Sequence, residues 1–294
     1  MISGFAEVAA RLADLRGALG AIPEPSDRRI ALDAVRDALD RGAEPAAGAE
    51  IVAGGYAREC LLHEGPLFEV HLLRQRDAGT LHALKTPCGD RASDPLLRRL
   101  ILDEAAHQGR VAHPACLAFR ALLRLPDGRP ALLTDHVEAP TLQAILDQGP
   151  LDAEAALALA RRLGEALAAV HTAGIVHGDV KPGNVFLPGG KPEAAVLFDF
   201  GLARPIGAPW RREDVERAQT PRFAGPGRQE PDALAGPADD LWSLGRLLGV
   251  ACSTPSFALS ALVAALTSPE PANGLRSACE IDGFLGDCGT DDTT

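Results

Sequence analysis

Apolar side chains near the start of the chain recur every three or four residues, which is the spacing of one face of a helix. We expect this helix to end at Gly20, and a second helix to run from Ser26, a suitable N-cap, to about Leu39, with Gly42 as its stop signal. An Ala/Gly/Pro linker over 42–50 follows, so residues 1–50 are predicted to form an N-terminal helical extension. The apolar positions of the first helix are Phe5, Val8, Leu12, Leu15 and Leu19.

Two interpretations of this extension stay open. In the one we favour, the two helices form a hairpin that packs on the domain that follows. In the other, residues 1–42 form a surface for a partner or for self-association, because an apolar stripe too short for a coiled coil still needs a cover.

From Tyr56 the pattern changes to strands, which are expected to build a five-stranded sheet within residues 51–138. A helix over 95–110 interrupts the strands and carries Glu104. The predicted strands cover 57–62, 67–74, a segment that ends at Lys85, 116–125 and 130–136.

From Thr141 the apolar spacing becomes helical again, so residues 139–294 are predicted to be mainly helical. A long amphipathic helix is expected over 152–171. A second begins near Asp240, and two shorter helices follow over 256–267 and 275–285.

Composition excludes several classes of function. A net charge of −11 argues against a nucleic-acid-binding surface. Six cysteines without a Cys-x-x-Cys pair indicate reduced thiols and no metal cluster. The longest apolar stretch, 257–266, is too short to cross a bilayer, and the N-terminus lacks the basic start of a secretory signal. We therefore expect a cytoplasmic protein that contacts neither nucleic acid nor membrane.

Rare residues mark the candidate chemistry. The chain has three lysines, at 85, 181 and 191, and two asparagines, at 184 and 273. Lys181 and Asn184 both fall in His-Gly-Asp-Val-Lys-Pro-Gly-Asn over 177–184, and Asp-Phe-Gly follows at 199–201. Arg is a poor substitute where a compact ammonium must meet a phosphate, so the retained lysines indicate phosphoryl transfer.

These motifs resemble those of the protein kinase catalytic domain, in its eukaryotic-like (Hanks-type) Ser/Thr form, over about residues 56–285. The Ala- and Arg-rich composition suggests a bacterial source. The resemblance implies an α+β, two-lobed fold: a small five-stranded antiparallel sheet lobe with one helix, and a mainly helical large lobe. It also implies ATP and Mg²⁺ as cofactors, with Mn²⁺ as a possible substitute, and an unknown protein substrate.

The resemblance assigns roles to individual residues. Asp179 would act as the base, Lys181 would steady the transferring phosphate, and Asn184 and Asp199 would hold the metal ions. Lys85 would pair with Glu104 to position the nucleotide phosphates, and Thr220 would end the substrate-binding segment. The remaining nucleotide-binding positions are Gly65, Val70, Ala83, the gatekeeper Thr134, the hinge residues Asp135 and Val137, and Phe186.

The glycine-rich loop of the family is degenerate here. Its three glycine positions fall at His63, Gly65 and Phe68, so only the middle glycine remains. Phe68 adds bulk and Pro66 removes an amide donor where backbone should approach phosphate. We expect weaker nucleotide binding or a different loop posture.

Other departures concern regulation and the large lobe. Gly178 replaces the Arg that pairs with a phosphorylated activation loop in many kinases, and residues 202–219 contain no Ser, Thr or Tyr. We therefore expect activity without activation-loop phosphorylation. Gly227 replaces the Glu that would pair with Arg276, with Glu230 as a possible stand-in. The family's helix G is expected to be reduced or absent, and the polar Gln108 occupies a usually apolar position.

Three functions remain in competition. The first is a Ser/Thr protein kinase, because every direct catalytic group is present. The second is a pseudokinase that acts as a binding or scaffold module, which the degenerate loop favours. The third is a small-molecule phosphotransferase, since some of those enzymes share His-Gly-Asp followed by Asn, although they lack the Lys-Pro between them.

Overall fold

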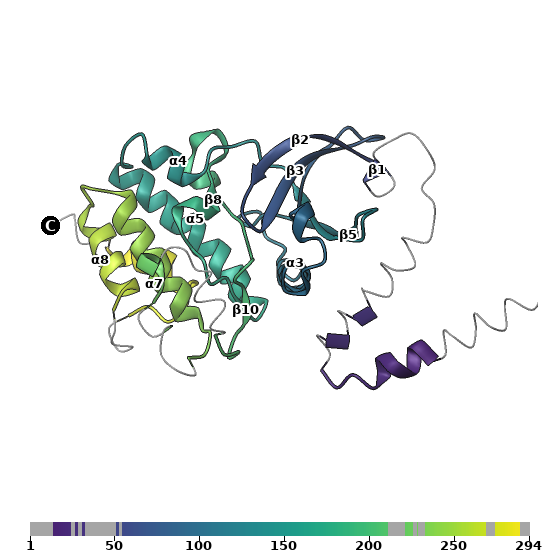
Figure 1. Ribbon diagram of the computed structural model, residues 1–294. Helices are drawn as coiled ribbons and strands as arrows, with labels where there is room; N and C mark the ends of the chain where they lie inside the picture. Colours follow the sequence, from purple (N-terminus) through teal and green to yellow (C-terminus); the bar gives the residue numbers. More distant parts are fainter. Residues whose placement is uncertain are drawn as a thin grey trace, which may run out of the picture. The chain divides into compact units, whose positions relative to one another are not determined.

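The computed structural model describes residues 55–210, 233–268 and 274–288, together with short stretches at 14–24, 27–28, 31–32, 51–52, 221–225 and residue 228. Contacts divide the chain into two compact units, labelled by element in Figure 1. The first unit comprises Met1–Asp103 and Ala121–Leu133, and the second comprises Glu104–Arg120 and Thr134–Thr294.

A fragment of the N-terminal extension is helical. Residues 14–20 form helical turns, and the amide of Ala21 donates to the carbonyls of Gly17 and Ala18 where the helix ends. This end point matches the predicted stop at Gly20. Most of the second predicted helix and the linker 42–50 lie outside the described residues, so the two interpretations of the extension stay predictions.

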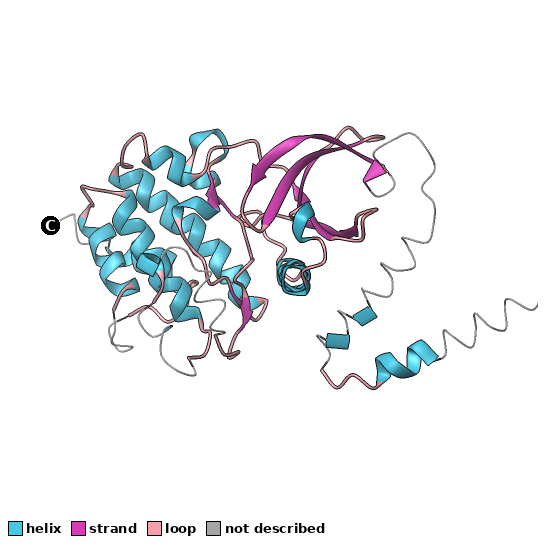
Figure 2. Cartoon of the chain, in the orientation of Figure 1, coloured by secondary structure: helices cyan, strands magenta, loops and turns pink. Residues whose placement is uncertain are grey.

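The first unit is built on an antiparallel sheet, drawn in magenta in Figure 2. The five predicted strands are confirmed, and a short additional strand pairs with the edge of the sheet. The strand order is β1-β2-β3-β4-β6-β5. The strands are β1 (Ile51–Val52), β2 (Tyr56–Glu64), β3 (Phe68–Gln75), β4 (Leu81–Pro87), β5 (Phe119–Arg124) and β6 (Pro130–Asp135).

Alternation along β3 and β4 assigns each side chain to one face of the sheet. Leu73 and Leu84 are fully buried and form a small core with Ala131 and Leu133. The register pairs Val70 with Lys85, and Leu72 with Ala83, so these four residues occupy the opposite face. Three predicted nucleotide-binding residues, Val70, Ala83 and Lys85, therefore share one face of the sheet.

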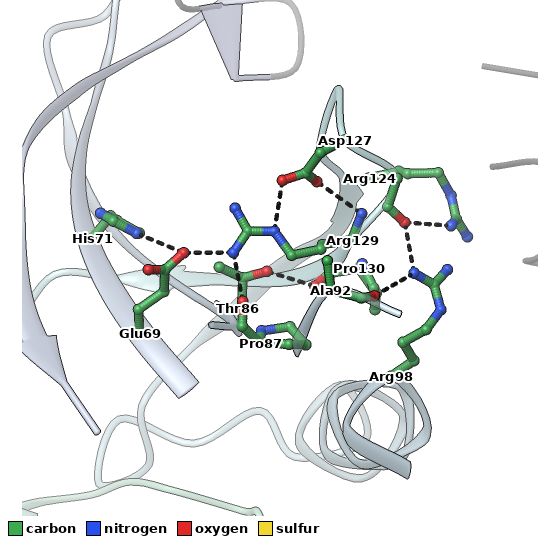
Figure 3. Close-up of polar contacts among 11 residues, drawn as sticks. Glu69, His71, Thr86, Pro87, Ala92, Arg98, Arg124, Asp127, Arg129 and Pro130 are labelled. Atoms are coloured by element: carbon green, nitrogen blue, oxygen red, sulfur yellow. Dashed lines mark hydrogen bonds and ion pairs between the residues drawn. The ribbon is translucent and has the colours of Figure 1, made fainter. Parts of the chain in front are cut away.

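A cluster of charged side chains around the buried Arg129 ties β3, β4 and the β5–β6 turn together (Figure 3). Arg129 Nη1 donates to Glu69 Oε1 at 2.6 Å and to the Pro87 carbonyl at 2.5 Å, while its Nε donates to Asp127 Oδ2 at 2.7 Å. His71 Nε2 lies 3.3 Å from Glu69 Oε1. Burial acts to raise the pKa of Glu69, but the hydrogen bonds from Arg129 and His71 outweigh it and the pKa is lowered. The cluster therefore holds the ends of three segments in place.

Helix α3 (Pro95–Gln108) crosses the boundary between the two units. Asp94 Oδ1 accepts from the amides of Leu96 at 2.9 Å and Leu97 at 3.4 Å, which caps the first turn. The helix ends two residues before the predicted end at residue 110. Arg98 Nη1 donates to the Gly128 carbonyl at 3.0 Å, which anchors the N-terminal half to the β5–β6 turn.

The second unit is mainly helical, as predicted, and α5 forms its centre. Asp152 accepts from the Ala155 amide at 2.8 Å and starts this helix, whose buried face packs against α7, α8 and α9. The helices are α4 (Leu142–Leu146), α5 (Ala153–Thr172), α7 (Pro237–Ala251), α8 (Phe257–Leu266) and α9 (Glu280–Cys288). In the part of the chain that the structure describes, no helix is both long and apolar enough to cross a membrane.

Two boundaries differ from the expectation because of local turn chemistry. Helix α7 begins at Pro237, where the missing amide donor of proline costs nothing, rather than near Asp240. Helix α9 begins at Glu280 rather than near residue 275. Ser277 Oγ accepts from the Cys279 amide at 3.3 Å, so a turn precedes that helix.

Short strands frame the loop that follows α5. Strand β7 (Ile175–Val176) pairs with β10 (Arg204–Pro205), and β8 (Val185–Phe186) pairs with β9 (Val196–Leu197), all antiparallel. Five 3-10 turns complete the described elements: η1 (Gly89–Arg91), η2 (Pro182–Asn184), η3 (Pro188–Gly190), η4 (Pro192–Ala194) and η5 (Pro221–Phe223). Residues 177–184 are therefore fixed at both ends by strands.

Candidate active site

Asp240, on α7, anchors the start of the loop 177–184. Its Oδ2 accepts from the amide of His177 at 2.8 Å and lies 2.9 Å from His171 Nε2, and its Oδ1 accepts from the amide of Gly178 at 2.8 Å. The carboxylate is fully buried. Burial acts to raise the pKa of Asp240, but the His171 contact and the amide donors outweigh it, so the pKa is lowered. The ionised Asp240 carboxylate thus fixes the backbone at the start of the loop 177–184.

His177 supports the loop as a neutral imidazole. Its Nε2 lies 3.2 Å from the Phe198 carbonyl, which can only accept, and its Nδ1 accepts from the Asp179 amide at 3.3 Å. The ring packs edge-on against Phe200 at 4.8 Å. Complete burial lowers the pKa of His177, which keeps the ring neutral and both hydrogen bonds intact. His177 therefore holds the backbone of Asp179.

Asp179, Lys181 and Asn184 form one hydrogen-bonded group. Lys181 Nζ donates to Asp179 Oδ2 at 2.7 Å, and Asn184 Nδ2 donates to the same oxygen at 2.9 Å. Asn184 Nδ2 also donates to the Asp179 carbonyl at 2.9 Å. Both amide hydrogens of Asn184 thus hold Asp179, whose carboxylate is partly exposed and able to meet a substrate hydroxyl.

The β8–β9 ladder brings Asn184 and Asp199 to one end of a hairpin. Val185 pairs with Leu197, and the Phe198 amide donates to the Asn184 carbonyl at 3.0 Å, so Asp199 follows directly beyond Asn184's partner. Asp199 has φ +66°, a left-handed conformation that is costly for a residue with a side chain. Strain of this kind is typical of functional positions.

The donor set of this hairpin end fits Mg²⁺. Asn184 uses its amide hydrogens on Asp179, which leaves the amide oxygen as its ligand atom, and Asp199 supplies a carboxylate. No group of three or more His, Cys, Asp and Glu side chains with metal-binding geometry occurs among the described residues. A magnesium ion bound jointly by two protein oxygens, water and nucleotide phosphates does not require such a group.

Lys85 lies beside the residue that replaces the last glycine of the family's loop. Its Nζ is 5.4 Å from the centroid of the Phe68 ring, within the range of a cation–π contact. Phe68 therefore contributes to the surroundings of the ammonium group. This contact was not foreseen from the sequence, because it depends on the β3–β4 register.

The loop between β2 and β3 is held by its neighbours. The Gly65 amide donates to the Phe68 carbonyl at 2.9 Å and closes the turn. Cys88, directly after β4, donates its amide to the Leu67 carbonyl at 3.0 Å and its thiol to the Gly65 carbonyl at 3.4 Å. Two carbonyls and one amide of this loop are thus used internally, which supports the expectation of a posture different from an open glycine-rich loop.

The predicted gatekeeper Thr134 and the hinge residues Asp135 and Val137 lie at the end of β6 and directly after it. Thr134 is buried, and its hydroxyl donates to the Asp135 carbonyl at 3.2 Å. The Asp135 carboxylate accepts two hydrogen bonds from Arg120, both 2.6 Å long, so its side chain is already engaged. Val137 is half-buried and its carbonyl accepts from the Ala139 amide at 3.0 Å.

Phe186, one of the predicted nucleotide-binding residues, stacks on Phe198 with centroids 4.0 Å apart and an interplanar angle of 14°. The stack joins β8 to the residue that precedes Asp199. Glu104 is buried on α3 and belongs to the second unit, whereas Lys85 belongs to the first. Their ion pair therefore stays a prediction.

Gln108 does not remain an unsatisfied polar group. Its Nε2 donates to the Leu117 carbonyl at 2.8 Å, and the Leu117 amide donates to the Leu197 carbonyl at 2.9 Å. A hydrogen bond therefore takes the place of the usual apolar contact. Thr220, Gly227 and Glu230 lie outside the described residues, so Thr220's role and the pairing proposed for Arg276 stay predictions.

Comparisons with known proteins identify the family of this chain. The model of the protein kinase domain matches residues 56–261. The chain belongs to the protein kinase family. The crystal structure of the Mycobacterium tuberculosis PknI kinase domain superposes with a TM-score of 0.58 at 21% identity, covering 83% of this chain and 99% of that chain. That similarity confirms the two-lobed kinase fold.

Curated bacterial relatives carry the name serine/threonine-protein kinase. PkaB of Streptomyces coelicolor is 35% identical over 182 residues, which cover 55% of this kinase and 43% of PkaB. Myxococcus xanthus pkn2 is 32% identical over 191 residues (63% and 23%), and M. tuberculosis PknK is 31% identical over 218 residues (72% and 19%). The kinase chain spans less than half the length of each. These relatives confirm the resemblance to Hanks-type bacterial Ser/Thr kinases.

Proposed function

We propose that this kinase transfers the γ-phosphate of Mg-ATP to Ser or Thr hydroxyls of proteins. The hydrogen-bonded group of Asp179, Lys181 and Asn184 carries this proposal. It places a partly exposed carboxylate beside an ammonium group, and the Asn184 side-chain amide donates to the same carboxylate. A lysine two residues after the base is the family's pattern for Ser/Thr rather than Tyr substrates, and the names of the bacterial relatives support the same substrate class.

The residues divide the work as follows. Asp179 orients the substrate hydroxyl and accepts its proton while the hydroxyl oxygen bonds to the γ-phosphorus. The bond from that phosphorus to the bridging oxygen breaks, and ADP leaves. Lys181 counters the charge on the transferring group. Asn184 and Asp199 would hold Mg²⁺, which neutralises phosphate charge when bound.

Activity without activation-loop phosphorylation is the second part of the proposal. Gly178 cannot supply the guanidinium that would read a phosphate, and residues 202–219 offer no hydroxyl to modify. The Asp240 anchor and the His177 bridge support the same view, because they hold the catalytic loop through groups that need no modification.

A pseudokinase remains the second candidate, and one observation favours it. The Phe68 ring lies against Lys85, and Cys88 donates hydrogen bonds to the carbonyls of Gly65 and Leu67 in the neighbouring turn. The space in which the phosphates would bind is therefore more crowded than it would be with a glycine-rich loop. Nucleotide binding alone would not separate the two functions. Phosphate transfer would.

The deciding experiment measures transfer of labelled γ-phosphate from Mg-ATP to the chain itself and to a generic protein substrate. Asp179→Asn keeps the size of the base and removes its charge, and Asp90→Asn is the matched change at an exposed site. We expect label on Ser or Thr with wild type and Asp90→Asn, and a loss of about 1000-fold with Asp179→Asn. No label with Mg²⁺ or Mn²⁺ would favour the pseudokinase, and label confined to metabolites would favour a small-molecule phosphotransferase.

A further inference from the structure

Gly178 adopts a conformation and a location that exclude a side chain. Its φ is +78°, in the left-handed region that favours glycine. A Cβ built there would lie 2.7 Å from Trp210 Cη2 and 2.8 Å from the Leu202 carbonyl oxygen. The place where many kinases carry an arginine is therefore filled by an aromatic ring from the segment that follows Asp-Phe-Gly.

An arginine nevertheless reaches the same point from elsewhere in the sequence. Arg228 is buried, and its Nη1 donates to the Gly178 carbonyl at 2.5 Å. Its guanidinium carbon lies 3.8 Å from the centroid of the Trp210 ring. Among the aromatic rings, the indole of Trp gives the strongest cation–π contacts, and removal from water strengthens them further. Arg228 thus joins the catalytic loop and the activation segment at once.

The opposite edge of Trp210 is fixed by α7. Trp210 Nε1 donates to Asp239 Oδ2 at 3.3 Å, and the same oxygen accepts from the Gly236 amide at 2.9 Å. Asp240, the next residue, holds the amides of His177 and Gly178. Two consecutive carboxylates therefore hold the activation segment and the catalytic loop.

Backbone hydrogen bonds extend this attachment along the segment. The amides of Gly207 and Trp210 donate to the carbonyls of Ala235 and Ala233 at 2.8 and 2.9 Å, and the Ala235 amide donates to the Ala208 carbonyl at 2.8 Å. Strand β10 pairs with β7, which leads directly into the catalytic loop. Residues 204–210 are thus held on both sides before Trp210 reaches Gly178.

We propose that Trp210, Arg228 and Asp239 form a permanent clamp that positions the catalytic loop through the Gly178 carbonyl, in place of a phosphate-dependent contact. The inference rests on the proposed kinase function and names its means of regulation. These three side chains are positioning residues: they act on Asp179 through the backbone next to it. The clamp needs no modification, since each contact uses unmodified side chains of the chain itself.

The test compares Arg228→Met, which keeps the length of the side chain but removes its charge and donors, with Arg161→Met at an exposed ion pair. We expect Arg228→Met to lower kcat by about 10- to 100-fold, the effect of one lost charge-assisted hydrogen bond, with KM for ATP changed less than about twofold. Arg228→Lys should recover part of the rate, because it restores the charge but not the stacked plane. Arg161→Met should match wild type.

Hydrogen exchange of peptides covering 175–182 and 203–210 tests the clamp without relying on catalysis. Trp210→Phe keeps a ring but loses the donor to Asp239, and Trp242→Phe is the control at the chain's other tryptophan. We expect faster exchange in both peptides for Arg228→Met and Trp210→Phe, and wild-type exchange for Trp242→Phe. If wild type shows no transfer but the exchange differences occur, the kinase function fails and the clamp stands. Unchanged kcat together with unchanged exchange in Arg228→Met would overturn the clamp.

Discussion

The catalytic loop of this kinase keeps the motif of its family, whereas the β2–β3 loop departs from it. Residues 177–184 keep the family's motif with Asp179, Lys181 and Asn184, and Asp240 and His177 hold the backbone of this loop. The β2–β3 loop has lost two of the family's glycines, and Cys88 engages its carbonyls. Groups that touch the reacting atoms have few chemical substitutes, whereas a loop that covers phosphates through backbone tolerates change. The comparison shows that the catalytic motif and the nucleotide-binding loop can be retained to different degrees within one domain.

Among the substitutions that test this comparison, replacing Lys85 should have the largest effect on phosphate transfer. Lys85 is the side chain of the first unit that is predicted to contact the nucleotide phosphates. Lys85→Ala should lower transfer by about 100-fold or more and weaken Mg-ATP binding as well. Calorimetry and steady-state rates would measure the two effects. Lys191→Ala, at the exposed third lysine, should change neither. Retained nucleotide affinity in Lys85→Ala would show that Phe68 and its neighbours bind the nucleotide without this charge.

Asp240→Asn tests whether the catalytic loop depends on its buried anchor. The substitution removes a charge that faces the His171 ring and the amides of His177 and Gly178. Loss of one partner from a buried charged group costs about 3–5 kcal/mol of unfolding free energy. Urea unfolding would report the loss, with Asp147→Asn at an exposed site as its control. A loss below about 1 kcal/mol would mean that the loop holds its shape without this carboxylate.

Acidification should weaken the same region through His177. The folded state lowers the pKa of His177 from its ordinary value of 6.5, so the unfolded state takes up the proton first. Stability should therefore fall as pH drops below about 6.5, while the lowered pKa of Asp240 acts only at much lower pH. Unfolding midpoints at pH 7.5 and 5.5 should differ less in His177→Phe than in wild type. The exposed change His63→Phe should leave the pH dependence as it is.

The smallest expected effect concerns the degenerate loop itself. Phe68→Gly restores a glycine and removes the ring beside Lys85, so Mg-ATP affinity should rise by a few-fold. Titration calorimetry would measure the change, and thermal unfolding would show whether the loss of the side chain destabilises the sheet. An unchanged or weaker affinity would mean that the loop, in the posture fixed by Cys88, does not need that glycine.

The sequence predicted the features that depend on local periodicity and on short motifs. The five strands, the long helix α5 and the grouping of Asp179, Lys181 and Asn184 all fall within short stretches of chain. It did not predict the two-residue strand β1, which is too short to show a pattern. Gln108 stood out in the sequence only as a polar residue at a usually apolar position, and its hydrogen bond to the Leu117 carbonyl depends on a turn that no periodicity reveals.

The clamp could not be found from sequence for a different reason. Arg228 and Gly178 are 50 residues apart, and Trp210 and Asp239 are 29 residues apart, so their contacts exist only after the large unit has folded. Nothing in the sequence distinguishes Arg228 from the other arginines among the 26 in the chain. The sequence showed only that Gly178 replaces an arginine of the family. Which other arginine lies near Gly178 can be seen only in the folded structure.

The contact between Arg228 and Trp210 is non-covalent, so it contains no phosphoester bond that an enzyme could hydrolyse. A phosphate that orders an activation segment can be removed by a phosphatase, so the ordered state is reversible. The stack of Arg228 on Trp210 has no such off-switch. The proposed clamp therefore predicts a kinase that is active once it has folded, with its output set by synthesis, degradation and the supply of ATP and substrate.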